Sequence, residues 1–386
     1  MKRIDLIFYD AGGGHRSTAT ALSQVIEKQQ PNWQPRLVNI EKIGTIERTN
    51  TNIFDIIIGR LTGSEIYNLI LKKGWTFLFP LFPLLRTLTK SNIRQNSSEL
   101  IAMFESHWRK NQPDLVVSCI PFFNQILRES LQKARPTTPF VTILTDFADS
   151  PPHYWIEPQE QFLICPTEQA VEQARTFGYQ EKRIFRTSGL VINPRFYDPI
   201  TVDRRSERQR LDLDPDLPTG LVLFGGYGSK VILEIAKRLE CFQDKLQLIF
   251  ICGRNEELVS ALRQSQGFQK RFVTTFTEDI AYYMHLADFF IGKPGPGSLS
   301  EAMAMKLPVI TEGNALTMIQ EKYCCEWITD KQVGIVISNF HNIERAVEKL
   351  IQPENYSHYR ANLNTLNNRA VFETVNILEN ILKIPI

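Results

Sequence analysis

Short apolar runs alternate with longer amphipathic stretches along the first half of the chain. Apolar runs bounded by turn residues predict buried strands. We expect these strands at 4–9, 36–40, 115–120, 140–144 and 162–165. Helical periodicity separates them, for example over 17–29 and 125–133. This alternation is typical of a doubly wound parallel sheet.

Residues 194–219 interrupt the pattern with four prolines and charges of both signs, which predicts a linker and a polar first segment of a second domain. The alternation then restarts. Further strands are expected at 221–224, 246–252, 272–275, 289–291, 308–310 and 334–337, followed by helices at about 342–352 and 369–383.

Each half opens with an apolar strand and a glycine-rich turn, Gly12–Gly14 in one and Gly225–Gly228 in the other. The fold class expected is therefore α/β, with two Rossmann-like doubly wound parallel-sheet domains and an interdomain cleft, because ligands bind at the carboxyl ends of such strands. We place the domains at 1–195 and 205–368. The last helix, about 369–386, is expected to pack back on the first domain.

Composition narrows the function classes. The 386 residues carry 44 Lys and Arg against 42 Asp and Glu, a net charge of +2, and 43% are hydrophobic. These values exclude a disordered chain and a strongly basic nucleic-acid binder. Six cysteines without a CxxC pair argue against a disulfide scaffold or a structural zinc site. With no signal peptide and no apolar run of about 18 residues, we expect a cytoplasmic location.

The first glycine-rich turn carries a histidine, His15, at the expected start of a helix. A neutral imidazole there can accept a proton near pH 7, and the positive end of the helix favours the neutral form. A histidine that only caps the turn is the alternative. The run Gly12-x-Gly14-x-x-Ser17, with Glu41 after the second strand, is a degenerate dinucleotide fingerprint and leaves NAD binding open.

Two further turns are suited to anions. The run Gly225-Gly226-Tyr227-Gly228-Ser229 brings backbone N–H groups close to a phosphate, or else forms a tight strand–helix turn. The run from Gly292 to Ala304, rich in glycine and proline, precedes a helix that Ser298 is expected to cap, with Glu301 at the third helical position. That pair is a capping box in one interpretation, and in the other Glu301 holds a ribose diol.

Several motifs together resemble one family, from about residue 4 to residue 340. They are Gly12-Gly13-Gly14-His15-Arg16, Pro113-Asp114-Leu115-Val116-Val117-Ser118, Thr145-Asp146 with His153 and Trp155, Asp214-Pro215-Asp216-Leu217-Pro218, Ile251-Cys252-Gly253-Arg254-Asn255, and Lys293-Pro294-Gly295-Pro296-Gly297-Ser298-Leu299-Ser300-Glu301-Ala302. In this order they resemble the monogalactosyldiacylglycerol synthase branch of the MurG-like glycosyltransferases, which belong to family 28.

The resemblance implies a two-domain GT-B fold and inverting transfer from a UDP-sugar, with no chelated metal and no other cofactor. It assigns the general base to His15, on the acceptor side with Gly13 and Gly14. The donor residues that it implies are Gly226, Gly228, Ser229, Gly295, Gly297 and Ser298 at the diphosphate, Phe276 at the uracil, Glu301 at the ribose, and Gln320 and Glu321 at the sugar. Arg254 adds a charge-assisted contact or is a solvated turn residue.

One misleading motif and two departures from the family pattern qualify this assignment. The run Asp212-x-Asp214-x-Asp216 looks like a metal-binding DxD but lies in the expected linker, so we interpret it as a solvated loop. The segment 311–321 frames the Gln320–Glu321 pair differently from the plant enzymes, and Asn124 stands where they have a histidine-containing segment. Both changes bear on the identity of the sugar and of the acceptor.

An apolar wedge predicts contact with a membrane. Residues 75–85 hold eight large apolar side chains, including Trp75, Phe77, Phe79 and Phe82, and basic residues such as Lys72, Lys73 and Arg86 flank them. Such a segment is too short to span a bilayer but suits an anionic membrane surface. A buried helix pair is the alternative. The sequence thus predicts a peripheral membrane hexosyltransferase that uses a UDP-sugar and a lipid acceptor such as diacylglycerol; a GT-B UDP-sugar 2-epimerase, a non-catalytic UDP-sugar-binding module and an NAD-dependent dehydrogenase are the rivals.

Overall fold

A computed structural model describes residues 1–10, 13–43, 45–46, 51–52, 93–265 and 270–384. The described chain forms two compact units. Unit 1 holds the described residues up to 194 together with the segment from 368 onward, and unit 2 holds 195–367. The ranges predicted from the sequence were 1–195 and 205–368, with the last helix returning to the first domain. Each unit is described by itself.

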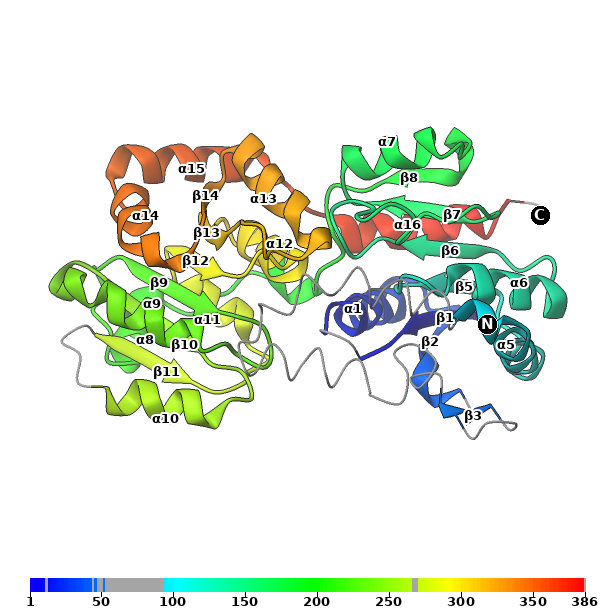
Figure 1. Cartoon of the computed structure of the whole chain (residues 1–386), viewed down its shortest axis with the longest axis horizontal. Coiled ribbons are helices and arrows are strands. Elements are labelled where there is room, and N and C mark those ends of the chain that lie inside the picture. The colour runs from blue at the N-terminus through cyan, green and yellow to red at the C-terminus, as the bar shows by residue number, and fades with distance from the viewer. Residues whose placement is uncertain (11–12, 44, 47–50, 53–92, 266–269, 385–386) are drawn as a thin grey trace. The chain divides into compact units, whose positions relative to one another are not determined.

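Unit 1 is built on a six-stranded parallel sheet with the order β2-β1-β5-β6-β7-β8 (Figure 1). The strands are β1 (Lys2–Phe8), β2 (Trp33–Asn39), β5 (Leu115–Ser118), β6 (Phe140–Ile143), β7 (Phe162–Cys165) and β8 (Ile184–Arg186). The α-helices are α1 (Gly14–Gln29), α5 (Ser97–Asn111), α6 (Asn124–Ala134), α7 (Glu168–Thr176) and α16 (Ala370–Ile381). Smaller elements are η1 (Ile40–Lys42), β3 (Thr45–Ile46), β4 (Thr51–Asn52) and η3 (Glu181–Arg183), and η4 (Pro194–Phe196) spans the division between the units.

The central strands of unit 1 are buried along their whole length, as expected when helices cover both faces of a parallel sheet. One face packs under α5 and α6, where Phe104 and Trp108 are fully buried. The last helix, α16, packs on α1, and the carboxylate of Glu379 accepts a hydrogen bond from Gln30 at 3.2 Å. The C-terminal segment therefore completes the first unit rather than the second.

Unit 2 repeats the plan, with a second six-stranded parallel sheet in the order β11-β10-β9-β12-β13-β14 (Figure 1). The strands are β9 (Thr219–Leu223), β10 (Gln247–Ile251), β11 (Arg271–Thr274), β12 (Phe289–Gly292), β13 (Val309–Glu312) and β14 (Gly334–Ile337). The helices are α8 (Arg204–Arg210), α9 (Val231–Leu239), η5 (Glu240–Lys245), α10 (Glu256–Gln264), α11 (Ile280–Leu286), α12 (Pro296–Ala304), α13 (Ile319–Lys331), η6 (Phe340–Asn342), α14 (Ile343–Leu350) and α15 (Pro353–Thr365).

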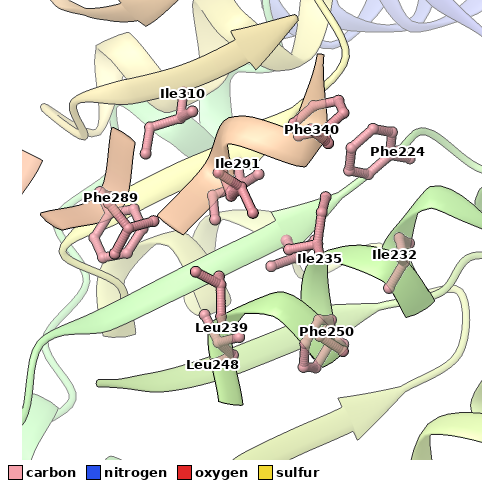
Figure 2. Packing of buried hydrophobic residues seen from close by; sticks show 14 of the residues in the cluster. Phe224, Ile232, Ile235, Leu239, Leu248, Phe250, Phe289, Ile291, Ile310 and Phe340 are labelled. Carbon is pink, nitrogen blue, oxygen red and sulfur yellow. The ribbon is translucent and has the colours of Figure 1, made fainter. Parts of the chain in front are cut away.

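The core of unit 2 lies between this sheet and the helices α9 and α14. Helix α14 buries Ile343, Ala346, Val347 and Leu350, a spacing of three and four residues that gives one apolar face. Figure 2 shows side chains of α9 against strand residues in the same cluster. The labelled members are Phe224, Ile232, Ile235, Leu239, Leu248, Phe250, Phe289, Ile291, Ile310 and Phe340. The doubly wound fold class predicted from the alternation is confirmed for both units.

The polar segment before β9 is more than a linker. It contains α8, whose Arg208 is 3% exposed and donates to the carbonyl of Leu286 and to the Asp288 carboxylate, at 2.7 and 2.8 Å. Burying an arginine is tolerated because these groups compensate its lost hydration. Charge along the sequence could not reveal this, since its partners lie about 80 residues away.

In each sheet the strand order reverses between two neighbouring strands, and open α/β sheets bind ligands at such a point. The reversal falls between β1 and β5 in unit 1 and between β9 and β12 in unit 2. The turns that leave the carboxyl ends of these four strands are the turns that the sequence singled out, together with the segment after β5.

Candidate functional site

His15 lies in the first turn of α1, which begins at Gly14, three residues earlier than the predicted start at residue 17. Gly13 allows this because it has a φ of 82°, in the left-handed region that glycine adopts without steric cost. The imidazole Nδ1 lies 2.8 Å from the carbonyl oxygen of Cys119, which follows β5. The histidine thus bridges the two strands at which the order of the unit 1 sheet reverses.

The partners of Nδ1 determine the tautomer of His15. A carbonyl oxygen can only accept a hydrogen bond, so Nδ1 carries the proton and donates a hydrogen bond to the carbonyl oxygen of Cys119. The Thr145 hydroxyl, from the segment after β6, also lies 3.1 Å from Nδ1. The other ring nitrogen, Nε2, therefore has the lone pair that a general base uses.

Aromatic rings hold the imidazole in place. The ring centres of Tyr9 and Trp155 lie 4.7 and 5.8 Å from the ring centre of His15. Trp155 is fully buried, and its indole N–H donates to the carboxylate of Asp146 at 2.9 Å. The Thr145-Asp146 and Trp155 motifs, separated in sequence, thus come together around His15.

Burial lowers the pKa of His15 to about 4, and the hydrogen bond to Cys119 opposes this shift. The neutral form was predicted from the helix dipole, whereas removal of the imidazole from water is the main cause. At neutral pH the imidazole is uncharged and ready to accept a proton.

The position of Glu41 left NAD binding open as an interpretation, but its carboxylate already accepts a hydrogen bond from the protein backbone. One of its carboxylate oxygens accepts the backbone N–H of Asp10 at 2.8 Å, and Asp10 in turn pairs with Arg16 and accepts from Asn39. Burial raises the pKa of Glu41. The carboxylate secures the turn before α1, a structural role that the dinucleotide interpretation did not anticipate.

In unit 2 two turns interlock at the carboxyl edge of the sheet. A Cβ atom on Gly228 would lie 2.3 Å from the carbonyl oxygen of Cys252, and one on Gly253 would lie 2.5 Å from that of Gly226. The backbone N–H of Arg254 donates to Gly226 at 2.9 Å. Only glycines permit this approach, which presents the turn 225–229 at the end of β9.

A cationic side chain and two aromatic rings border the turn 225–229. The guanidinium of Arg254 lies 4.7 Å from the centre of the Phe276 ring and 5.9 Å from that of Tyr227. Phe276 is 45% exposed, and its ring lies 3.8 Å from where a Cβ of Gly226 would be. Arg254 is thus stacked rather than only solvated, and an exposed flat surface stands beside the glycine-rich turn.

The expected cap of α12 is wrong. The helix begins at Pro296, its N-cap is Gly295, and no side chain caps it. Proline suits the first helical position because its fixed φ is already helical, so the helix starts two residues before Ser298. Ser298 lies inside the first turn and Glu301 lies in the second, which rules out the capping-box interpretation.

Glu301 is half-buried, and its pKa is raised to about 8 because burial disfavours the carboxylate, with Arg195 opposing the shift. The folded protein thus holds a proton that the unfolded chain, with a carboxyl pKa of 4.5, releases. Folding stability should therefore fall as pH rises from 4.5 to 8.

Glu301→Gln should remove this pH dependence, because a neutral amide of the same shape needs no proton. We expect the variant to be more stable than the parent at pH 8.5, by about 1 kcal/mol because the site is partly hydrated, with the difference shrinking toward pH 4.5. Thermal unfolding of both proteins between pH 5 and pH 9 measures it. Parallel curves for the two proteins would contradict the assignment.

Lys293, between β12 and α12, makes a contact that the sequence did not predict. Its Nζ lies 2.7 Å from Oε1 of Glu321, whose side chain is 7% exposed and lies in the first turn of α13. A Cβ on Gly295 would lie 3.2 Å from Cε of Lys293 and 3.7 Å from Oε1 of Glu321. Gln320, beside Glu321, directs its amide to the sulfur of Met318.

The predicted residues therefore form local groups. Gly226, Gly228, Ser229, Arg254 and Phe276 surround the turn after β9, and Gly295, Gly297, Ser298 and Glu321 surround the start of α12. Because Gly292 of β12 pairs with Leu223 of β9, both turns leave the same edge side by side.

Three contributors were not identified from the sequence. They are the Cys119 carbonyl, the Thr145 hydroxyl as a partner of His15, and the Lys293–Glu321 ion pair. A backbone carbonyl carries no side-chain signal. Lys293 did have one, since it is a cation directly after a buried strand within a glycine- and proline-rich run.

The apolar wedge at 75–85, with Trp75, Phe77, Phe79, Phe82, Lys72, Lys73 and Arg86, lies outside the described residues. Within the described ranges, no helix is long and apolar enough to cross a membrane. No group of three or more His, Cys, Asp or Glu residues suited to a metal ion occurs there either. Of the DxD run, Asp216 is 67% exposed and pairs with Arg205, as expected for a solvated loop.

Two family models match the chain, one in each half. Residues 39–192 match the family model of monogalactosyldiacylglycerol (MGDG) synthase, and residues 221–365 match that of the glycosyltransferase family 28 C-terminal domain. A probable chloroplastic monogalactosyldiacylglycerol synthase 2 of Oryza sativa subsp. japonica is 29% identical over 285 residues, 71% of this chain and 60% of the relative. The Spinacia oleracea monogalactosyldiacylglycerol synthase is 25% identical over 401 residues, 99% of this chain and 73% of the relative. The chain thus spans well under the full length of these plant proteins.

Solved structures share the fold at low identity. S. aureus MnaA, solved with UDP, aligns with a TM-score of 0.62 and 14% identity over 99% of this chain and 97% of its own. Acinetobacter baumannii MurG aligns with a TM-score of 0.59 and 13% identity over 98% and 100%. The fold is therefore that of the GT-B glycosyltransferases. Residues 39–192 are thus similar to the MGDG synthases, and residues 221–365 are similar to the C-terminal domain of the family 28 glycosyltransferases.

Proposed function

We propose that this protein is an inverting glycosyltransferase that moves a hexose from a UDP-sugar to the hydroxyl of a lipid such as diacylglycerol. The observation that carries the proposal is the combination, in one chain, of an MGDG synthase match and a family 28 C-terminal match. The family names point to a glycosyltransferase. The UDP-sugar donor, the lipid acceptor and the membrane surface are part of the proposal.

In this mechanism His15 is the general base. Its Nδ1–H is held by Cys119, so Nε2 accepts the proton of the acceptor hydroxyl. A base with a pKa of about 4 takes the proton late, once the hydroxyl oxygen has begun to bond to the anomeric carbon and has become strongly acidic. The hydroxyl attacks from the face opposite UDP, so the configuration inverts, and UDP leaves.

The turns of unit 2 supply the proposed donor site. In this proposal, backbone N–H groups of the turn 225–229 and of the start of α12 bind the diphosphate, because a preorganised set of such dipoles stabilises the charge that develops on a leaving diphosphate. The exposed Phe276 ring and the guanidinium of Arg254 suit stacking of the uracil. We assign Glu301 to the ribose on the basis of the family resemblance, and the proposed reaction requires no chelated metal and no other cofactor.

A product experiment tests the function. The full chain is incubated with UDP-galactose, UDP-glucose or UDP-N-acetylglucosamine and with vesicles of phosphatidylcholine and anionic phospholipid, with or without diacylglycerol. We expect UDP release and a hexosyl-diacylglycerol, detected by mass spectrometry, only when diacylglycerol is present. Replacing the anionic lipid with phosphatidylcholine alone is expected to lower the rate if the basic residues near the wedge bind the membrane surface.

The rival functions give different products. A UDP-sugar 2-epimerase would convert UDP-N-acetylglucosamine to its epimer without any lipid, and a non-catalytic binding module would bind UDP-sugars and release nothing. A dehydrogenase would bind NAD and not UDP. Absence of a glycolipid from every donor would overturn the proposal. A peripheral location at the cytoplasmic face of a membrane is the setting we propose for the reaction.

A further inference from the structure

A partly buried ion pair lies at the N-terminus of α12. The Lys293 ammonium lies 2.7 Å from Oε1 of Glu321, and both groups lie against Gly295, the N-cap of the helix. Unpaired backbone N–H groups make such a helix end positive. A second positive charge beside it raises the local potential further, so Lys293 is stable there only with a counter-charge. Glu321 supplies that charge from α13.

The family resemblance assigns Glu321 to the donor sugar, yet in the structure one of its oxygens pairs with Lys293. With its side chain 7% exposed, against 30% for Lys293, Glu321 is the inner member of the pair. The lysine is thus the more accessible group, and it stands where the α12 dipole favours an anion. Arg254, the cation named from the sequence, is stacked on Phe276 instead.

We propose that Lys293 binds the diphosphate of the nucleotide donor directly, and that Glu321 is a positioning residue that holds the ammonium for this contact. The inference rests on the proposed function and names the group that takes up leaving-group charge in this site. As UDP departs, negative charge grows on its outer phosphate, and an ammonium already in place stabilises that charge without reorganising.

Comparing the affinities of the full chain for UDP and for uridine separates the effect of the lysine's charge from the effect of its packing. Uridine lacks both phosphates, so a diphosphate contact affects only UDP. Lys293→Met should weaken UDP binding about tenfold, the size expected for loss of one charge-assisted hydrogen bond, and leave uridine binding within about twofold. Lys293→Arg should keep most of the UDP affinity, because the charge remains. Calorimetry for UDP and NMR titration for uridine measure these affinities.

Arg254→Met is the matched control, since it removes a cation of the same site that stacks on an aromatic ring. This variant should weaken the binding of UDP and of uridine by similar factors. If Lys293→Met also weakens both ligands equally, or changes neither, Lys293 does not contact the diphosphate and the inference is wrong. If the parent protein binds neither UDP nor uridine, the proposed UDP-sugar function itself fails, and the inference fails with it.

The positioning role of Glu321 is tested by a double-mutant cycle on UDP affinity. If Glu321 acts through Lys293, Glu321→Gln should shift UDP affinity by about threefold or more in the parent and by less than about twofold in the Lys293→Met background. Equal shifts in both backgrounds would show an independent contact and overturn that role. Thermal unfolding of each variant identifies any that fail to fold, and Lys293→Arg keeps the charge test available in that case.

Discussion

Replacing His15 by alanine should reduce glycolipid formation by about 10²–10⁴-fold, the range expected for loss of a general base. The reason is specific to the geometry. Cys119 fixes the proton on Nδ1, so the only other ring nitrogen, Nε2, takes the proton in the proposed mechanism. Product formation from UDP-hexose and diacylglycerol vesicles measures the loss, and UDP affinity should be unchanged because the donor turns belong to unit 2.

The pH profile of the parent enzyme sharpens this prediction. Burial holds the pKa of His15 at about 4, so the active, deprotonated form should persist from neutral pH down to about pH 5 and be lost only as pH falls through 4. An ordinary histidine would lose activity near pH 6.5 instead.

His358→Ala is the control for this prediction. That histidine lies on α15, where its imidazole contacts Gln332 and Asn362, and we expect unchanged activity. Full activity of the His15→Ala protein would rule out His15 as the base.

The second large effect is expected at Gly228. Its φ of 67° already disfavours a side chain, and a Cβ would lie 2.3 Å from the carbonyl oxygen of Cys252. Gly228→Ala should therefore force apart the interlocked turns, destabilise unit 2 by about 3 kcal/mol or more, and abolish measurable UDP binding. Thermal unfolding and UDP calorimetry provide the two readouts.

Gly225→Ala is the matched substitution, in the same turn and also at positive φ, 74°. Nothing lies within 4 Å of its added Cβ, so only the conformational cost of about 1 kcal/mol applies. The two variants should differ clearly in stability. Equal destabilisation by both would mean that close packing of the two turns does not matter and that φ alone explains the glycines.

Much of the fold was predictable because parallel sheets bury both faces of their central strands. Such strands appear as short apolar runs, and the predicted runs at 115–120, 140–144 and 162–165 correspond to observed strands within one or two residues. Helix starts were less accurate. The turn at Gly13 begins α1 earlier than amphipathic periodicity indicates, and Pro296 begins α12 earlier than the expected Ser298 cap, because backbone conformation determines the first turn.

The site was predictable as a set of turns but not as a set of contacts. Glycine-rich runs after strands are visible in sequence, and so is a histidine beside one of them. The hydrogen bond from His15 to Cys119 spans 104 positions, and the ion pair from Lys293 to Glu321 spans 28. Contacts of this kind depend on which strands become neighbours, and no local pattern carries that information.

The sequence by itself determined two doubly wound halves, the turns of the candidate site, and the family that these turns resemble. Only the tertiary structure decided the proton position on His15, the stacking of Arg254 and the pairing of Lys293 with Glu321. The physical reason is the same in each case. Propensity and periodicity act over a few residues, whereas tautomers, burial and ion pairing depend on groups that the strand order brings together from distant parts of the chain.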